Sequence, residues 1–285
     1  MAESAKQAVQ QHAALSPTQL RGRTIGATLR RMPFTLALLG VIILCALLTN
    51  LFGEMISHSE ALRRSGYGLP ALREGRIWTL LTGIFLEIYP WLVAGNIWLV
   101  ALFVGGYEAR AGSKHVALVF FTTQIGGAFL TAVAIVWPLT ATGWTWAQHL
   151  EQASDLGASV GALGCAAALT AGFARRWRVT TRAILFGALV ALLLVTHRIW
   201  DIEHLLAATL GVGLGRLLQT PQERAALTVR DATARRLTWQ RPFTLNSRRG
   251  RVRAALATAI ALVGLINVTS TLVTRAGNVS RAGPN

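Results

Sequence analysis

The sequence predicts an all-α protein, a polytopic bundle of transmembrane helices, and three observations support this prediction. Of the 285 residues, 53% are hydrophobic and only 14% are charged, with a mean hydropathy of +0.46. A soluble domain of this length needs more charge to cover its surface. The apolar residues gather in runs of membrane-spanning length, and most basic residues lie between alternate runs.

Seven apolar runs form the predicted spans. They cover residues 34–53, 85–107, 116–138, 158–173, 183–197, 199–218 and 252–273. The fourth and fifth runs are short, as is typical of helices that others enclose, so we expect both inside the bundle. The first run follows a polar stretch without a signal-peptide core, so we expect it to be retained in the mature protein.

The net charge of +16 follows the same division of the chain. With seven spans and a cytoplasmic N-terminus, 21 of the 28 Lys and Arg residues lie inside, and the outer loop 139–156 has none. This positive-inside pattern accounts for the charge without a nucleic-acid partner. We therefore expect a plasma-membrane protein with its C-terminus outside, whose basic inner loops contact anionic lipid. The scarcity of Lys relative to Arg is typical of a GC-rich bacterial genome.

The predicted organisation is a cytoplasmic tail (1–33), a six-span core (34–218), a basic cytoplasmic loop (219–251), a seventh helix (252–275) and a tail (276–285). The two cysteines, Cys45 and Cys165, both lie within apolar spans. Small buried hydrophobic residues are the simplest interpretation of such cysteines. We expect no disulfide, metal or cofactor.

Small residues recur at helical spacing on the fourth and sixth spans. They are Gly157, Gly161 and Gly164 on the fourth, and Ala208, Gly211 and Gly215, in line with His204, on the sixth. Two helices lined in this way can approach closely. Both spans run from outside to inside, so residues near their starts lie at the same depth.

Polar residues at those starts suggest a site, because ionisable side chains are costly in a bilayer and tend to mark function. Ser159 opens the fourth span, and Asp201, Glu203 and His204 lie near the start of the sixth. Across a close interface, His204 would accept the proton of Ser159, the helix N-terminus would favour a developing oxyanion, and Asn96 of the second span would donate to it. No third, acidic member is evident, since Asp201 is stacked beside His204 on one helix.

Structural interpretations of the same residues remain open. Ser159 can serve as a helix cap among packing glycines, His204 can belong to a polar cluster with its acidic neighbours, and Asn96 can bond across helices. A transporter that relays protons through Asp201, Glu203 and His204 is a third class, but it needs polar residues at several depths, and the other spans have few.

These positions resemble the rhomboid superfamily of intramembrane serine proteases over about residues 78–218. The residues that carry the resemblance are Trp78 in the first loop, Asn96 in the second helix, Glu108 and Gly112 at that helix's end, Gly157-Ala158-Ser159, and His204 followed by Gly211 and Gly215. The resemblance implies a six-helix core plus a seventh helix, Ser159 as nucleophile, His204 as general base and Asn96 as oxyanion donor. Gly157 and Gly161 would support the oxyanion pocket, and a single-span membrane protein would be the substrate.

Three residues differ from the family pattern. Val160 follows the serine where the family has glycine, Leu92 replaces a histidine four residues before Asn96, and Thr79 replaces an arginine after the tryptophan. Two of these changes touch transition-state stabilisation, and losing one oxyanion donor costs about 10²–10³ in rate. The alternative hypothesis is therefore an inactive rhomboid-like protein that binds membrane clients or partner subunits. The sequence leaves its oligomeric state open.

Overall fold

The computed structural model describes residues 29–49, 64–87 and 89–221, together with residues 223, 225, 227 and 228. Within these residues every regular element is a helix, and the one strand-like pairing is an antiparallel bridge between Tyr67 and Asp155. The all-α prediction is confirmed for this part of the chain. The predicted seventh helix, the basic loop 219–251 and both tails lie outside the described residues, apart from a few positions at their edges.

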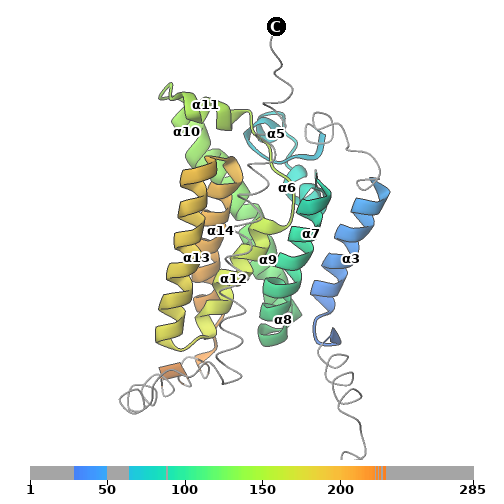
Figure 1. The fold of residues 1–285 in the computed structure, drawn as a ribbon, viewed down its shortest axis with the longest axis vertical. Helices are drawn as coiled ribbons and strands as arrows, with labels where there is room; N and C mark the ends of the chain where they lie inside the picture. The colour runs from blue at the N-terminus through green and yellow to red at the C-terminus, as the bar shows by residue number, and fades with distance from the viewer. Residues whose placement is uncertain are drawn as a thin grey trace, which may run out of the picture.

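The long helices follow the first six predicted runs (Figure 1). In chain order they are α3 (Pro33–Leu48), α7 (Pro90–Leu99) with α8 (Gly105–Ala111), α9 (Ser113–Leu130) with α10 (Trp137–Thr140), α12 (Ser159–Leu169), α13 (Arg175–Thr196) and α14 (Ile199–Leu217). The π-helical segments Val100–Val104 and Thr131–Val136 join α7 to α8 and α9 to α10. The short helices α5 (Leu69–Arg73), α6 (Thr79–Thr82) and α11 (Thr145–Glu151) lie at one end of the bundle.

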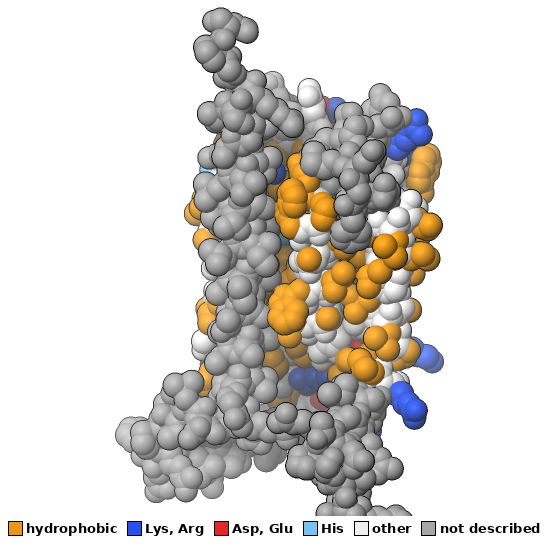
Figure 2. Space-filling model, turned by 45° about the vertical axis from the view of Figure 1, so that its right-hand side comes forward, with side chains coloured by type: hydrophobic (Ala, Val, Ile, Leu, Met, Phe, Trp, Pro, Cys, Tyr) orange, Lys and Arg blue, Asp and Glu red, His pale blue; other side chains and the backbone are white. Residues whose placement is uncertain are grey.

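Helix length and surface composition both indicate a membrane protein. Among the described residues, three helices are long and apolar enough to cross a membrane: Pro90–Ala111, Ser113–Thr140 and Arg175–Thr196. Pro33–Leu48 and Ser159–Gly172 are shorter apolar helices. On the face drawn in Figure 2, hydrophobic side chains cover the middle of the described bundle, and Lys and Arg side chains lie toward its ends. This distribution suits an apolar slab bounded by water on both sides.

The prediction that the fifth span is short and enclosed is wrong. Helix α13 has 22 residues, and only 22% of its most apolar window is buried. It begins at Arg175 rather than at residue 183, because arginines can extend a helix beyond the apolar layer and keep their charged ends in water. The second helix also differs: it begins at Pro90 rather than at residue 85, and proline at the first helical position favours that start.

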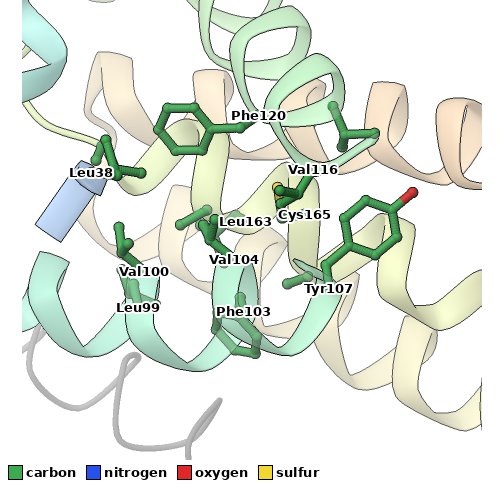
Figure 3. Packing of buried hydrophobic residues seen from close by; sticks show 14 of the residues in the cluster. Leu38, Leu99, Val100, Phe103, Val104, Tyr107, Val116, Phe120, Leu163 and Cys165 are labelled. Carbon is green, nitrogen blue, oxygen red and sulfur yellow. The ribbon is translucent and has the colours of Figure 1, made fainter. Parts of the chain in front are cut away.

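Helix α12 lies at the centre of the bundle. It packs against α9 and α14 and also contacts α7 and α8. Every residue of the segment 160–168 is buried, and most are Gly, Ala or Cys. In the main core cluster, Leu163 and Cys165 of α12 lie close to Val104 and Phe120 (Figure 3). Small side chains therefore allow α12 to be surrounded on several sides at short interhelical distance.

Glycines bring α12 and α14 into backbone contact. A Cβ atom added to Gly211 of α14 would overlap with the backbone of Gly164 on α12. One added to Gly215 would lie 2.6 Å from the carbonyl oxygen of Ala168. Ala208, one turn before Gly211, is fully buried. The small-residue stripe of the sixth predicted span thus faces α12.

Candidate functional site

The hydroxyl oxygen of Ser159 lies 2.9 Å from Nε2 of His204. Ser159 is the first residue of α12 and is half-buried, whereas His204 lies in the second turn of α14 and is buried. Both side chains stand near the starts of helices whose backbones touch further along. The distance is that of a hydrogen bond between a nucleophile and its base.

The tautomer of His204 follows from this contact. If the Ser159 hydroxyl donates to Nε2, the ring proton is on Nδ1, and Nδ1 is buried with no hydrogen-bond partner among the described residues. Asp201 does not accept a hydrogen bond from Nδ1 of His204. Its Oδ2 atom accepts hydrogen bonds from the Thr196 hydroxyl and, at 3.0 Å, from the Arg198 backbone N–H, so it caps the start of α14. Within the described residues the pair is a dyad.

The loop that leads into Ser159 is fixed by backbone hydrogen bonds. Tyr67 and Asp155 exchange two of them, of 3.0 and 2.8 Å, and the Gly157 N–H donates to the Gly83 carbonyl at 2.8 Å. Gly157 has φ +113°, which glycine adopts at little cost. A Cβ atom there would also overlap with the Glu87 carboxyl and lie 2.8 Å from the amide nitrogen of Asn96. Glycine is therefore required at 157 both for the turn and for the close approach of two polar groups.

Gln124 of α9 binds both ends of the turn around Ser159. Its Nε2 atom donates to the Gly157 carbonyl at 3.1 Å, and its Oε1 atom accepts the Gly161 N–H at 2.7 Å. The same Nε2 atom lies 3.2 Å from the Tyr67 hydroxyl, which in turn donates to Gly157 and Asp155. Gln124 and Tyr67 are fully buried. Together they hold the turn that presents the serine.

The residues after the serine face α9. A Cβ atom on Gly161 would lie 2.7 Å from the Phe120 ring, so this glycine serves the contact with α9 rather than the contact with α14. Val160 is fully buried, and one of its methyl groups would lie 3.0 Å from a Cβ atom on Gly127. The valine side chain is accommodated because α9 has a glycine opposite it.

Asn96 lies beside the turn on α7, and its amide is bonded to Glu87. The Asn96 Nδ2 atom donates to Glu87 Oε1, and the Asn96 Oδ1 atom is buried with no partner among the described residues. Both Asn96 and Glu87 are buried, and both approach Gly157. Leu92, one turn before Asn96, is half-buried and adds no polar group.

Two buried carboxyl groups lie next to the dyad. Asp155, four residues before Ser159, interacts with Glu203, the residue before His204. Both oxygens of Glu203 lack a hydrogen-bond partner among the described residues, and each of the two buried carboxyl groups disfavours a negative charge on the other. Burial raises the pKa of Asp155 to about 6, against hydrogen bonds that lower it.

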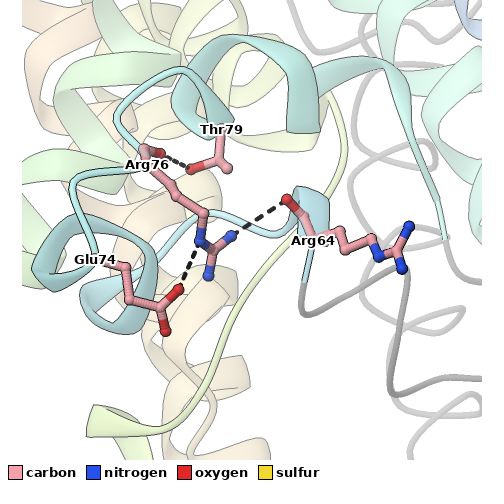
Figure 4. Close-up of polar contacts among 4 residues, drawn as sticks. All are labelled: Arg64, Glu74, Arg76 and Thr79. Carbon is pink, nitrogen blue, oxygen red and sulfur yellow. Dashed lines mark hydrogen bonds and ion pairs between the residues drawn. The ribbon is translucent and has the colours of Figure 1, made fainter.

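The first loop is held by its own polar contacts (Figure 4). The Arg76 guanidinium donates to Glu74 at 2.8 Å and to the Arg64 carbonyl at 3.2 Å, and the buried Thr79 hydroxyl donates to the Arg76 carbonyl at 2.7 Å. Thr79 therefore closes the turn that starts α6. Trp78 precedes it with a 56% exposed side chain.

Glu108 has a structural function: it accepts hydrogen bonds at the starts of two helices. Its buried carboxylate accepts hydrogen bonds from the backbone N–H groups of Phe34 and Thr35, from the Thr35 hydroxyl and from the Ser113 hydroxyl, at 2.6 to 2.9 Å. The donors belong to the starts of α3 and α9. Glu108 thus caps α3 and ties three helices together.

Sequence reasoning did not find Glu87, Gln124 or Tyr67. Each lies far from Ser159 in the chain and reaches the turn through tertiary packing, and no spacing rule indicates such contacts. A glutamine within the third apolar run and a glutamate near the start of the second were the available signals. Among the described residues, no group of three or more His, Cys, Asp or Glu is arranged to hold a metal ion.

The dyad, the turn before Ser159 and the Asn96–Glu87 pair form one polar site near the starts of α12 and α14. Comparisons of the chain with models of protein families, with curated proteins and with solved structures find no match.

Proposed function

We propose that this protein is a rhomboid-like intramembrane serine protease that cleaves single-span membrane proteins. The observation that carries the proposal is the 2.9 Å contact between the Ser159 hydroxyl and Nε2 of His204. A serine and a histidine in this geometry form the minimal unit of nucleophilic acyl transfer. The surrounding helices are apolar, and three of those in the described part of the chain are long enough to span a membrane.

The chemistry follows from the positions of the atoms. As Ser159 Oγ forms a bond to the scissile carbonyl carbon, its proton passes to His204 Nε2 and the carbonyl π electrons move to oxygen. When the oxyanion collapses, the C–N bond breaks and His204 gives its proton to the leaving amine. Water then attacks the acyl-enzyme with His204 again as base, which releases the acid and restores Ser159.

The oxyanion would be stabilised by groups at the start of α12. The N–H groups of the first helical turn have no intrahelical acceptor, and the positive end of the helix dipole lies there. The Gly161 N–H is already bonded to Gln124, so the N–H groups of Ser159 and Val160 are the backbone candidates. Asn96 donates one amide hydrogen to Glu87, and its second amide hydrogen would donate to the oxyanion.

The proposed setting is a six-span core with a seventh helix, an N-terminus in the cytoplasm and the site toward the outer face. The charge distribution of the sequence supports this orientation. A substrate helix would enter sideways from the lipid and unwind to present its scissile carbonyl.

Anionic lipid would bind the basic inner surface. Arg178 and Arg216 act there on the guanidinium group of Arg182, one nitrogen of which is buried with no hydrogen-bond partner among the described residues. Lipid phosphates would offset this concentration of positive charge.

The second candidate is an inactive rhomboid-like protein that binds membrane clients. The observation that favours it is Leu92, which adds no hydrogen-bond donor on the helix of Asn96. Under this hypothesis, Ser159→Ala leaves client association unchanged. Under the protease hypothesis, the same substitution stops turnover while the protein stays folded.

Purified full-length protein in liposomes, mixed with a panel of labelled single-span substrates, separates the two. Cleavage by the wild type that is lost in Ser159→Ala and kept in Ser154→Ala supports the protease. The Ser154 control removes a hydroxyl five residues earlier, outside the dyad. Absence of cleavage across the panel, together with client capture by both the wild type and Ser159→Ala, supports the binding protein.

A further inference from the structure

Glu87 is a buried acid, and no positively charged group among the described residues acts on it. It lies between α6 and α7, its Oε1 atom accepts the Asn96 amide, and it approaches the Cα atom of Gly157. It has no ion-pair partner among the described residues. The charged group that acts on it is Asp155, which is itself bonded to Tyr67 and paired with Glu203. An acid that faces only other acids is stable when it keeps its proton.

The same surroundings matter for the reaction. Asn96 donates one amide hydrogen to Glu87, and this contact fixes the plane of the amide and the direction of its second N–H. The oxyanion would form close to that N–H. A negative charge on Glu87 would repel the developing oxyanion, whereas a neutral carboxyl group orients the amide without this cost. A carboxylic acid kept neutral at an oxyanion site has a precedent in ketosteroid isomerase.

We propose that Glu87 is the positioning residue of the oxyanion pocket: a neutral carboxyl group, pressed against Gly157, that orients the Asn96 amide and compensates for the apolar Leu92. This proposal rests on the proposed proteolytic function. Burial raises the pKa of Glu87 well above its usual range, and Asp155 raises it further. Activity therefore falls at alkaline pH as Glu87 loses its proton.

The test is the pH dependence of substrate cleavage in liposomes, from about pH 6 to about pH 10. Glu87→Gln keeps an uncharged group of the same shape whose carbonyl accepts the Asn96 amide. It therefore retains the neutral-pH kcat to within about threefold and loses the alkaline decline. Glu87→Ala frees the amide and lowers kcat by about 10²-fold, the scale of one lost oxyanion donor, with KM little changed.

Glu74→Gln is the matched control, because Glu74 is an exposed glutamate of the preceding loop, and it leaves both rate and pH profile as in the wild type. The inference is overturned if Glu87→Gln keeps the alkaline decline of the wild type, or if Glu87→Ala cleaves as fast as Glu87→Gln. Since Glu87→Gln is isosteric, its result does not depend on whether Glu87→Ala folds. An inert wild type refutes the proposed function itself, and the Glu87 proposal with it, whereas an active wild type with unaffected Glu87 variants refutes only the latter.

Discussion

Gly211 of α14 rests on the backbone of Gly164 of α12, so closely that a methyl group on Gly211 would overlap with Gly164. The contact lies about two helical turns from His204. It sets how near the two helices approach, and so controls the separation of His204 from Ser159. A change that pushes the helices apart therefore lengthens the distance between Ser159 and His204.

Gly211→Ala should destabilise the protein by about 1–3 kcal/mol, because the added methyl group meets backbone that cannot rotate away. The thermal midpoint in detergent, followed by Trp fluorescence, measures the loss. Gly213→Ala on the same helix is the control: it has open space around it, so helix propensity should make it neutral or more stable by up to about 1 kcal/mol. Equal midpoints for the two variants would show that α12 and α14 are not in backbone contact.

Gln124→Leu should lower both stability and activity. It leaves the buried Gly161 N–H without its partner, at a cost of about 1–3 kcal/mol, while the Gly157 carbonyl keeps only its contact with the Tyr67 hydroxyl. The turn before Ser159 then loosens. Thermal midpoint and cleavage rate measure the two effects. Gln148→Leu, at an exposed position of α11, should change stability by less than about 0.5 kcal/mol. If Gln124→Leu is as stable as this control, Gln124 does not hold the turn.

Glu108→Ala should detach α3 from the bundle. The substitution removes the acceptor of two backbone N–H groups and two hydroxyls, and hydrogen bonds to a charged group contribute about 1.5–3 kcal/mol each. Limited proteolysis and thermal unfolding report the change. Glu151→Ala, which breaks an exposed ion pair with Arg73, should cost less than about 1 kcal/mol. A Glu108 variant as resistant as the Glu151 variant would contradict the capping function.

Stability should fall as pH rises through the titration of Asp155. Its pKa is raised from 3.8 to about 6 in the folded protein, so the folded state holds the proton more tightly than the unfolded chain. The resulting stabilisation is present below about pH 4 and is lost as pH rises through 6, a change of about 3 kcal/mol. The measurement is the difference in unfolding free energy between the wild type and Asp155→Asn at each pH. The unfolding free energy of the wild type minus that of Asp155→Asn should fall as pH rises through 6, and a value that rises with pH would reverse the assigned sign.

Parts of the site follow directly from the sequence. Ser159 and His204 open two spans that run in the same direction, so their depths match, and glycines at helical spacing predict a close approach of the same two helices. The bundle's helices were likewise expected from apolar runs. The first two turns of α13 were not, because the charged residues at 175–182 conceal a helix that continues beyond the apolar layer.

Other parts could not be predicted, because they depend on loops folding back over the bundle. Glu87 reaches Gly157, and Tyr67 reaches Asp155, across long stretches of chain without any repeating pattern. The accommodation of Val160 could not be predicted either. Its bulk suggested a change in the backbone next to Ser159, but Gly127 on α9 leaves space for the valine side chain. Such compensation between helices becomes visible only in three dimensions.

The most direct measurement is covalent labelling of the full-length protein in liposomes by a fluorophosphonate probe, with the modified residue located by mass spectrometry. If His204 activates Ser159, the probe should modify Ser159 in the wild type, and His204→Gln should slow labelling by about 10²–10⁴-fold while the thermal midpoint stays near that of the wild type. No modification of Ser159 in the wild type, or an equal labelling rate in the folded His204 variant, would contradict a working dyad.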